Sequence, residues 1–97
     1  MKQTLNTNIL GEKSASLAVT TEKLFSLYVV PKSGSHRNHR VTLEFSPDNE
    51  TTWVASRESV NGNADMLTLE AAATHVRACV CEPEGEASTV DIHIIGA

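Results

Sequence analysis

Apolar and polar residues alternate along much of this chain with a period of two. In residues 41–46 every second residue is apolar, namely Val41, Leu43 and Phe45. Successive side chains of a β-strand point to opposite faces, so this segment predicts a strand with one buried face. Trp53 lies in a second strand, predicted over residues 52–56, and the turn between the two segments predicts a hairpin.

The same alternation predicts further strands over residues 3–10, 14–20, 23–30, 66–70, 75–82 and 88–95. The strand at residues 23–30 is apolar on both faces, which predicts a central strand or one covered on both sides, and Pro31 is expected to end it. Ala71-Ala72-Ala73 is too short to form a helix alone and is expected to be a connection or a single turn. About eight short strands with almost no helix predict an all-β fold, an antiparallel β-sandwich with Greek-key or jelly-roll connections.

The turn before the tryptophan contains side chains that are able to bond to their own backbone. Ser46, Asp48, Thr52 and Trp53 resemble the Asp-box, a hairpin motif with the pattern Ser-x-Asp-x-Gly-x-Thr-Trp, and Glu50 departs from it at the glycine position. The resemblance implies a structural turn in which Asp48 accepts hydrogen bonds from backbone amides and the indole packs beneath it. Asn49 is a plausible substitute for the glycine, because asparagine adopts left-handed conformations more readily than most residues. A propeller is excluded, since it needs several blades of about 40 residues each.

Composition indicates one soluble globular domain spanning residues 1–97, with 21% charged and 40% hydrophobic residues. A chain of this size buries enough surface to fold with neither metal nor cofactor. The net charge of −4 argues against a nucleic-acid partner, which requires a concentrated basic surface. No apolar run has the length of a signal peptide or of a membrane span, so we expect no membrane partner and synthesis in the cytoplasm, with Cys79 and Cys81 reduced.

One segment runs against the overall negative charge. Residues 31–40 contain no acidic residue and carry a cluster of basic and histidine side chains: Lys32, His36, Arg37, His39 and Arg40. We interpret this segment as a loop and these five residues as a possible contact with an acidic partner. His36 and His39 alone do not predict a zinc site, which needs further ligands within reach.

The last two predicted strands form a hairpin in this interpretation, with a turn at residues 83–86. Pairing Cys79 with Asp91 would place Arg77 opposite His93 and Cys81 opposite Thr89. Such a face is chemically mixed, but a flat sheet makes ligands diverge, and no oxyanion donor accompanies the cysteine and histidine. We therefore predict no catalytic and no metal-binding residue.

Residues 41–48, Thr52-Trp53, the run His75-Val76-Arg77-Ala78 and residues 88–92 resemble small β-sandwich proteins of tailed bacteriophage virions. Head decoration proteins, head fibres and tail accessories belong to this class. The resemblance implies a non-enzymatic structural protein located in the virion, which decorates or stabilises the head through repeated contacts. Its partners would be the major capsid protein or other virion proteins, and further copies of itself in a homo-oligomer; residues 1–10 are a candidate subunit-contact arm.

Two alternatives from other classes remain open. The same sandwich could be a carbohydrate-binding module, although such sites stack sugars on exposed aromatic rings and this chain has few aromatic residues. A small enzyme using Cys79 or Cys81 with His93 is the other alternative. A position in the tail instead of the head is also compatible with the resemblance.

Overall fold

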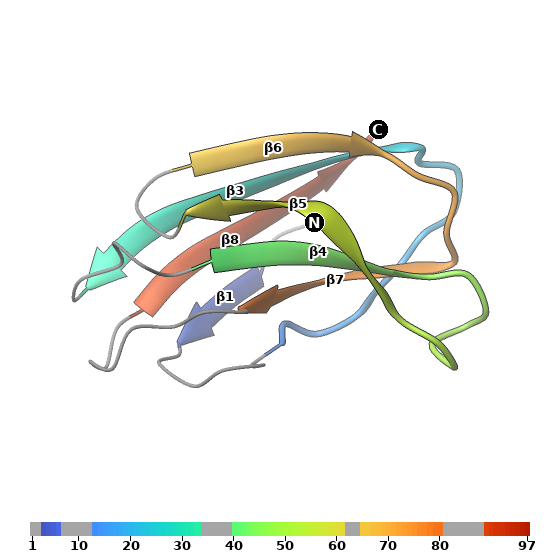
Figure 1. Ribbon diagram of the computed structural model, residues 1–97, viewed down its shortest axis with the longest axis horizontal. Coiled ribbons are helices and arrows are strands. Elements are labelled where there is room, and N and C mark those ends of the chain that lie inside the picture. The colour runs from blue at the N-terminus through green and yellow to red at the C-terminus, as the bar shows by residue number, and fades with distance from the viewer. Residues whose placement is uncertain (1–2, 7–12, 34–39, 62–64, 81–88) are drawn as a thin grey trace.

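The protein is described by a computed structural model that covers residues 3–6, 13–33, 40–61, 65–80 and 89–97. These residues form eight strands and no helix (Figure 1). The strands are β1 (Gln3–Asn6), β2 (Leu17–Ala18), β3 (Leu24–Ser33), β4 (Arg40–Ser46), β5 (Val54–Asn61), β6 (Asp65–Glu70), β7 (His75–Val80) and β8 (Thr89–Gly96).

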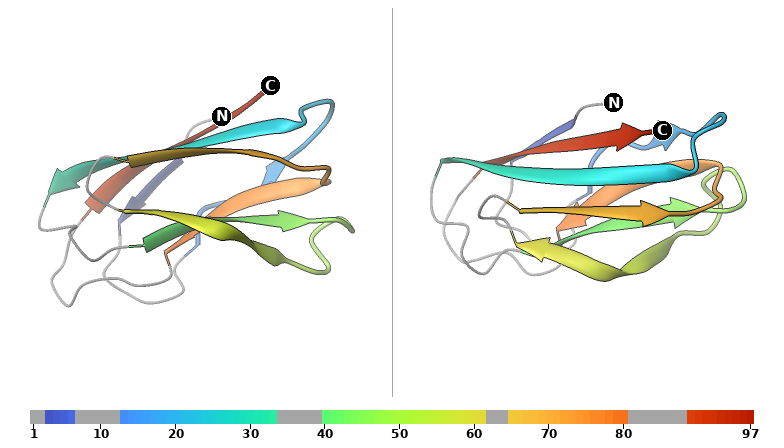
Figure 2. Two further views of the ribbon diagram at one scale, coloured as in Figure 1. Left: turned by 45° about the horizontal axis from the view of Figure 1, so that its top comes forward. Right: turned by 90° about the horizontal axis from the view of Figure 1, so that it is seen from above.

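The strands form two antiparallel sheets that pack face to face (Figure 2). The first sheet has the order β1-β8-β3-β6, and the second has the order β2-β7-β4-β5. Within the sheets, β1 pairs with β8, β2 with β7, β3 with β6 and β4 with β5. This nested pairing of first with last strand is the connectivity of a jelly roll. The prediction of an all-β antiparallel sandwich is confirmed, and of the two predicted topologies the strand order is the jelly roll.

The core lies between the sheets and is built by the alternation seen in the sequence. The first sheet contributes inward-facing side chains from three strands: Phe25, Leu27, Val29, Leu67, Val90, Ile92 and Ile94. The second sheet contributes Val41, Leu43, Val60, Val76, Ala78 and Val80. Phe25 and Phe45 meet edge to face, with ring centroids 5.3 Å apart. Burial of each large side chain stabilises the fold by about 1.5–3 kcal/mol, so the core is the main stabilising feature.

The hairpin on either side of the tryptophan turn is confirmed, since β4 and β5 pair in the register Phe45↔Val54. The second strand starts at Val54, two residues later than predicted. The register between β4 and β5 shifts between Thr42 and Glu44, where β5 accommodates extra residues as a bulge. Residues 71–73 connect β6 to β7 without a helical turn, as one of the two predicted alternatives requires.

The predicted hairpin of the last two strands is wrong. β7 lies in the second sheet and β8 in the first, so Cys79 pairs with Thr42 instead of Asp91. The apolar sides of β7 and β8 both face the core, from opposite layers. Alternation alone predicts that each strand has one buried face. Two such strands can bury these faces either as neighbours in one sheet or from two sheets that pack against each other.

The predicted end of the third strand at Pro31 is also wrong, because β3 continues to Ser33. The backbone amides of residues 25, 27 and 29 point toward β6, and those of the residues between them point toward β8. By this alternation, the position where Pro31 lacks an N–H also faces the β6 side. The pairing with β6 ends at Val29↔Asp65, and proline therefore removes no hydrogen bond of the ladder there. The register to β8 shifts between Pro31 and Ser33.

Candidate functional site

The outer face of the first sheet carries an exposed apolar surface. Among the described residues, five large hydrophobic side chains are strongly exposed, and four of them lie on this face: Leu24, Val30, Met66 and Ile95, each 45–50% exposed. Together with Tyr28 they form what we call the outer patch. The sequence predicted that the strand at residues 23–30 is central or covered on both sides. The structure confirms the first alternative, since β3 lies between β8 and β6, and its outer side is uncovered.

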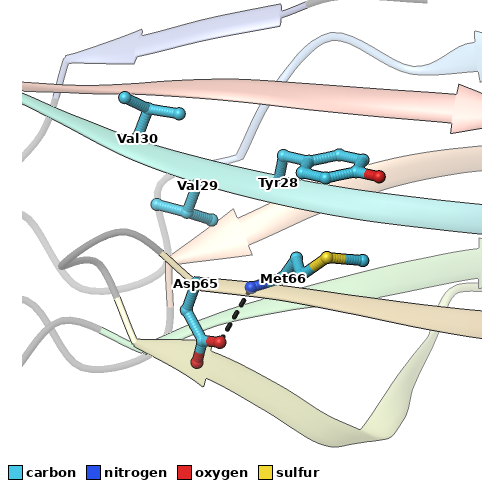
Figure 3. A pocket seen from close by; sticks show the side chains of 5 residues that line it. All are labelled: Tyr28, Val29, Val30, Asp65 and Met66. Atoms are coloured by element: carbon cyan, nitrogen blue, oxygen red, sulfur yellow. Dashed lines mark hydrogen bonds between the residues drawn. The ribbon is translucent and has the colours of Figure 1, made fainter.

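Strand register brings the outer patch together from three strands. Tyr28 on β3 lies between Met66 on β6 and His93 on β8. A shallow hollow on one side of the tyrosine is lined by residues of β3 and β6: Tyr28, Val29, Val30, Asp65 and Met66 (Figure 3). A second hollow is lined by Tyr28, Val30, His93 and Ile95. Tyr28 and Val30 therefore line both hollows.

The turn that follows β4 is organised by Ser46, whose side chain is fully buried. Its Oγ accepts hydrogen bonds from the amide of Asp48 at 3.3 Å and from the amide of Glu50 at 2.8 Å. The same Oγ donates to Oδ1 of Asp48 at 3.1 Å. One hydroxyl thus satisfies two backbone donors and orients the aspartate.

Asp48 closes the turn from the other side. Its Oδ1 accepts the amide of Thr52 at 2.8 Å, and its carbonyl accepts the amide of Thr51 at 3.3 Å. Hydrogen bonds from the side chain and the amide of Thr52 lower the pKa of the Asp48 carboxyl below its usual value. Asn49 and Glu50 both have positive φ angles, 55° and 71°, which is the φ pattern of a type I′ turn. The left-handed conformation therefore includes Glu50 itself, at the position where the motif has glycine.

The turn is docked on the segment before β7 through Thr74. The amide and the hydroxyl of Thr74 donate to the carbonyl of Ser46 at 2.8 and 3.0 Å, and its Oγ1 accepts the amide of Asn49 at 2.9 Å. Glu50 accepts a hydrogen bond from the hydroxyl of Ser16, and its Oε2 lies 3.9 Å from Nε2 of His75. Sequence reasoning missed Thr74, because no local pattern connects it to a turn 25 residues earlier.

Trp53 packs on the outer side of the second sheet, against Arg77 of β7. The guanidinium carbon of Arg77 lies 3.9 Å from the centre of its ring. Nε of Arg77 donates to Oε1 of Glu44 at 2.7 Å, and Nζ of Lys13 lies 3.8 Å from the same oxygen. The tryptophan turn is therefore held by hydrogen bonds and by the stacking of Arg77 on Trp53.

The predicted basic contact is described in part. Arg40 is the first residue of β4 and is exposed, and Lys32 belongs to β3. His36, Arg37 and His39 lie outside the described residues. The contact of these five residues with a partner stays a prediction. Residues 3–6 of the predicted subunit-contact arm form β1, which pairs with β8 of the same chain.

The cysteine and histidine considered for catalysis are not neighbours. Cys79 is buried on the outer side of β7 in the second sheet, whereas His93 lies on the outer side of the first sheet. Cys81 is outside the described residues. Within the described ranges, no group of three or more His, Cys, Asp or Glu side chains could hold a metal ion, and no helix is long and apolar enough to cross a membrane.

Comparison of the chain with protein-family models, with curated proteins and with solved structures gave no match.

Proposed function

We propose that this protein is a non-enzymatic structural protein that attaches to the virion of a tailed bacteriophage, on the head, through repeated protein–protein contacts. The outer patch is the proposed attachment surface. The partner would be the major capsid protein or another virion protein, and the location would be the assembled particle.

The observation that carries the proposal is the gathering of exposed apolar side chains on one sheet face. Single exposed hydrophobic residues are ordinary, but a contiguous set on one face is typical of a protein–protein interaction site. Two hollows beside Tyr28 make this face uneven, so that a partner's side chains can insert into it. An aromatic side chain next to apolar hollows is a favourable anchor at an interface. The polar side chain of Glu70, which lies opposite Leu24 on β6, borders the patch, as interface rims commonly do.

The fold and the sequence resemblance support the same proposal. Jelly rolls are used by viral capsid domains and also by lectins, so the fold alone does not select one function. The resemblance of residues 41–48, Thr52-Trp53 and the β7 and β8 segments to small virion proteins favours the first use.

The test is binding to particles. Purified protein is mixed with particles of the phage that encodes it, from which the protein has been removed or deleted, and the pellet is analysed after sedimentation. We expect saturable binding by the wild type and loss of at least tenfold in affinity for Val30→Glu and Ile95→Glu. Both substitutions place a charge in an apolar interface, which costs more than 1.4 kcal/mol when the charge is buried without a partner.

Val54→Glu is the matched control. Val54 is 59% exposed, more than either patch residue, and it lies on β5 in the second sheet. It should bind like the wild type if the outer patch is the attachment surface. Absence of sedimentation by the wild type contradicts the proposed function, and equal binding by all variants contradicts the proposed surface.

A carbohydrate-binding module is the alternative from a different class. Trp53 would be its natural stacking residue, but one face of the ring is already covered by the Arg77 guanidinium. This contact leaves that face of the indole ring unable to stack on a sugar. Saturable binding on a glycan array that is lost in Trp53→Ala, with the fold retained, would support the alternative.

A further inference from the structure

The strand β6 is a sheet edge that lacks the usual protection against pairing. Among the described strands, the edges are β1 and β6 in the first sheet and β2 and β5 in the second. Proteins protect edges by making them short, or with bulges, prolines and lysines. β2 has two residues, β1 has four, and β5 is bulged. β6 has six residues in unbroken register with β3, and its sequence contains no proline, glycine or lysine.

The register also shows which backbone groups of β6 face the open side. The amide of Ala71 donates to the carbonyl of Lys23 at 2.9 Å, which fixes the alternation along the strand. Residues 65, 67 and 69 therefore bond to β3, and the backbone groups of Met66, Thr68 and Glu70 point away from it. The amide of Met66 donates to Oδ1 of Asp65 at 2.8 Å (Figure 3). Within the described residues, no hydrogen bond outside the sheet ladder involves the amides of Thr68 and Glu70.

We infer that β6 pairs antiparallel with β6 of a second copy, about a two-fold axis that passes between the two Thr68 residues. In this register Thr68 faces Thr68 of the second copy, and Met66 faces Glu70. These are the residues whose backbone groups point outward. Three pairs form and the first sheets of the two copies join into one, and the amide of Met66 exchanges its hydrogen bond to Oδ1 of Asp65 for one to the carbonyl of Glu70 of the second copy. This is strand addition between identical chains, which joins two sheets through main-chain hydrogen bonds.

The strand is complementary to itself in charge. Its two acids, Asp65 and Glu70, lie at opposite ends. The antiparallel register places Glu70 opposite Met66 and Asp65 opposite Ala71, so no like charges face each other.

The strand is also complementary to itself in its apolar side chains. On the core side, Leu67 faces Leu69 of the second copy, and the half-buried Leu69 gains cover from Leu67. On the outer side, the patches of the two copies become neighbours through Met66. The occupant is therefore a second copy, and the inference does not depend on whether the dimer attaches to a virion.

The test uses the position on the two-fold axis. The mass in solution is measured by light scattering on a size-exclusion column, across a dilution series. We expect the wild type to have twice the chain mass of 10.5 kDa at high concentration. Thr68→Lys and Thr68→Glu each place like charges across the axis and should reduce the mass to that of one chain. Mixing the two variants places opposite charges across the axis and should restore the double mass.

Thr21→Lys is the matched control, because Thr21 is an exposed threonine outside the strands and receives the same charge. It should remain a dimer. Thr68→Pro, which removes an outward N–H without breaking the ladder to β3, should be a single chain and decides the matter if a charged variant does not fold. A wild type with the mass of one chain at every concentration overturns the inference. Dimers of unchanged strength in all Thr68 variants overturn it as well, and so does a mixture that stays at the mass of one chain.

Discussion

Arg77 lies over Trp53, with its guanidinium carbon 3.9 Å from the centre of the indole ring, and at the same time donates from Nε to Oε1 of Glu44 at 2.7 Å. The side chains of Arg77 and Glu44 are 18% and 13% exposed, so the pair is shielded from water over most of its surface. The stacking connects β7 to the segment that enters β5 and holds the tryptophan turn against the second sheet.

The stacking contact should be measurable as a coupling between the two side chains. We expect a double-mutant cycle of Trp53→Leu and Arg77→Met to give a coupling free energy of about 0.5–1 kcal/mol in urea unfolding, the range of partly exposed cation–π contacts. A coupling near zero, with both single variants folded, would mean that the two side chains are close without stabilising each other.

Glu44 contacts two cations, Arg77 in a shielded position and Lys13 in an exposed one. Arg77→Met should lower the free energy of unfolding by about 1–3 kcal/mol, because it leaves a largely buried carboxylate without its hydrogen-bond donor. Lys13→Met removes the other cation, whose side chain is 42% exposed and lies 3.8 Å from the same oxygen. This control should change stability by no more than about 1 kcal/mol. Equal effects of the two substitutions would contradict the assignment of Arg77 as the main partner.

Ser46 is expected to be the most sensitive residue of the turn. Ser46→Ala removes the acceptor of two backbone amides in a fully buried position and should lower the free energy of unfolding by about 1–3 kcal/mol. Ser59→Ala, at an exposed position on β5, is the control and should stay within about 0.5 kcal/mol of the wild type. The measurement is urea unfolding followed by tryptophan fluorescence, since Trp53 reports on the same region.

The period of two was sufficient to predict the fold class and most of the core. Val41 and Leu43 were assigned to a buried face, and both are buried. The sequence could not predict which strands are neighbours, because pairing depends on contacts between distant segments. The same limit explains why β7 and β8 were paired wrongly.

The outer patch was missed for a related reason. Alternating apolar residues on both faces of residues 23–30 indicate that each face is hydrophobic, but they do not say whether a second layer covers it. The central position of this strand was predicted correctly, but the pattern could not show that Leu24 and Val30 on its outer side are exposed. The local chemistry of the turn was more accessible to sequence reasoning, since Ser46, Asp48 and Thr52 lie within seven residues. The side chain of Ser46 accepts the amide of Asp48, and the side chain of Asp48 accepts the amide of Thr52.

Glu50 holds a left-handed conformation that favours glycine. Non-glycine residues in this region carry a cost of about 1–2 kcal/mol, and glycine loses part of that advantage through its greater freedom in the unfolded chain. We expect Glu50→Gly to raise the free energy of unfolding by roughly 0.5–1 kcal/mol. Glu50→Gln, which keeps the backbone cost and removes the charge beside His75, is the control and should not stabilise the protein. Destabilisation by Glu50→Gly beyond that of Glu50→Gln would show that the side-chain contacts outweigh the backbone cost.

Asp48 should make the turn sensitive to acid. Its pKa is lowered in the folded protein, chiefly by the hydrogen bonds from the side chain and amide of Thr52, whereas an unfolded aspartate titrates near pH ~3.9. A carboxyl whose folded pKa is depressed adds stability that is fully present above the unfolded pKa and is lost as the pH falls through the folded pKa. Asp48→Asn should therefore be less stable than the wild type at pH 7, and the difference should shrink as the pH falls below about 4.

Thr52→Val removes the hydroxyl but keeps the amide, so it should raise the pKa of Asp48 toward its usual value in an NMR titration of the side-chain carboxyl carbon. Thr21→Val should leave that pKa unchanged, because Thr21 lies outside the turn. An unchanged Asp48 titration in Thr52→Val would mean that the hydroxyl does not stabilise the carboxylate, and the expected acid sensitivity would then depend on the backbone amides alone.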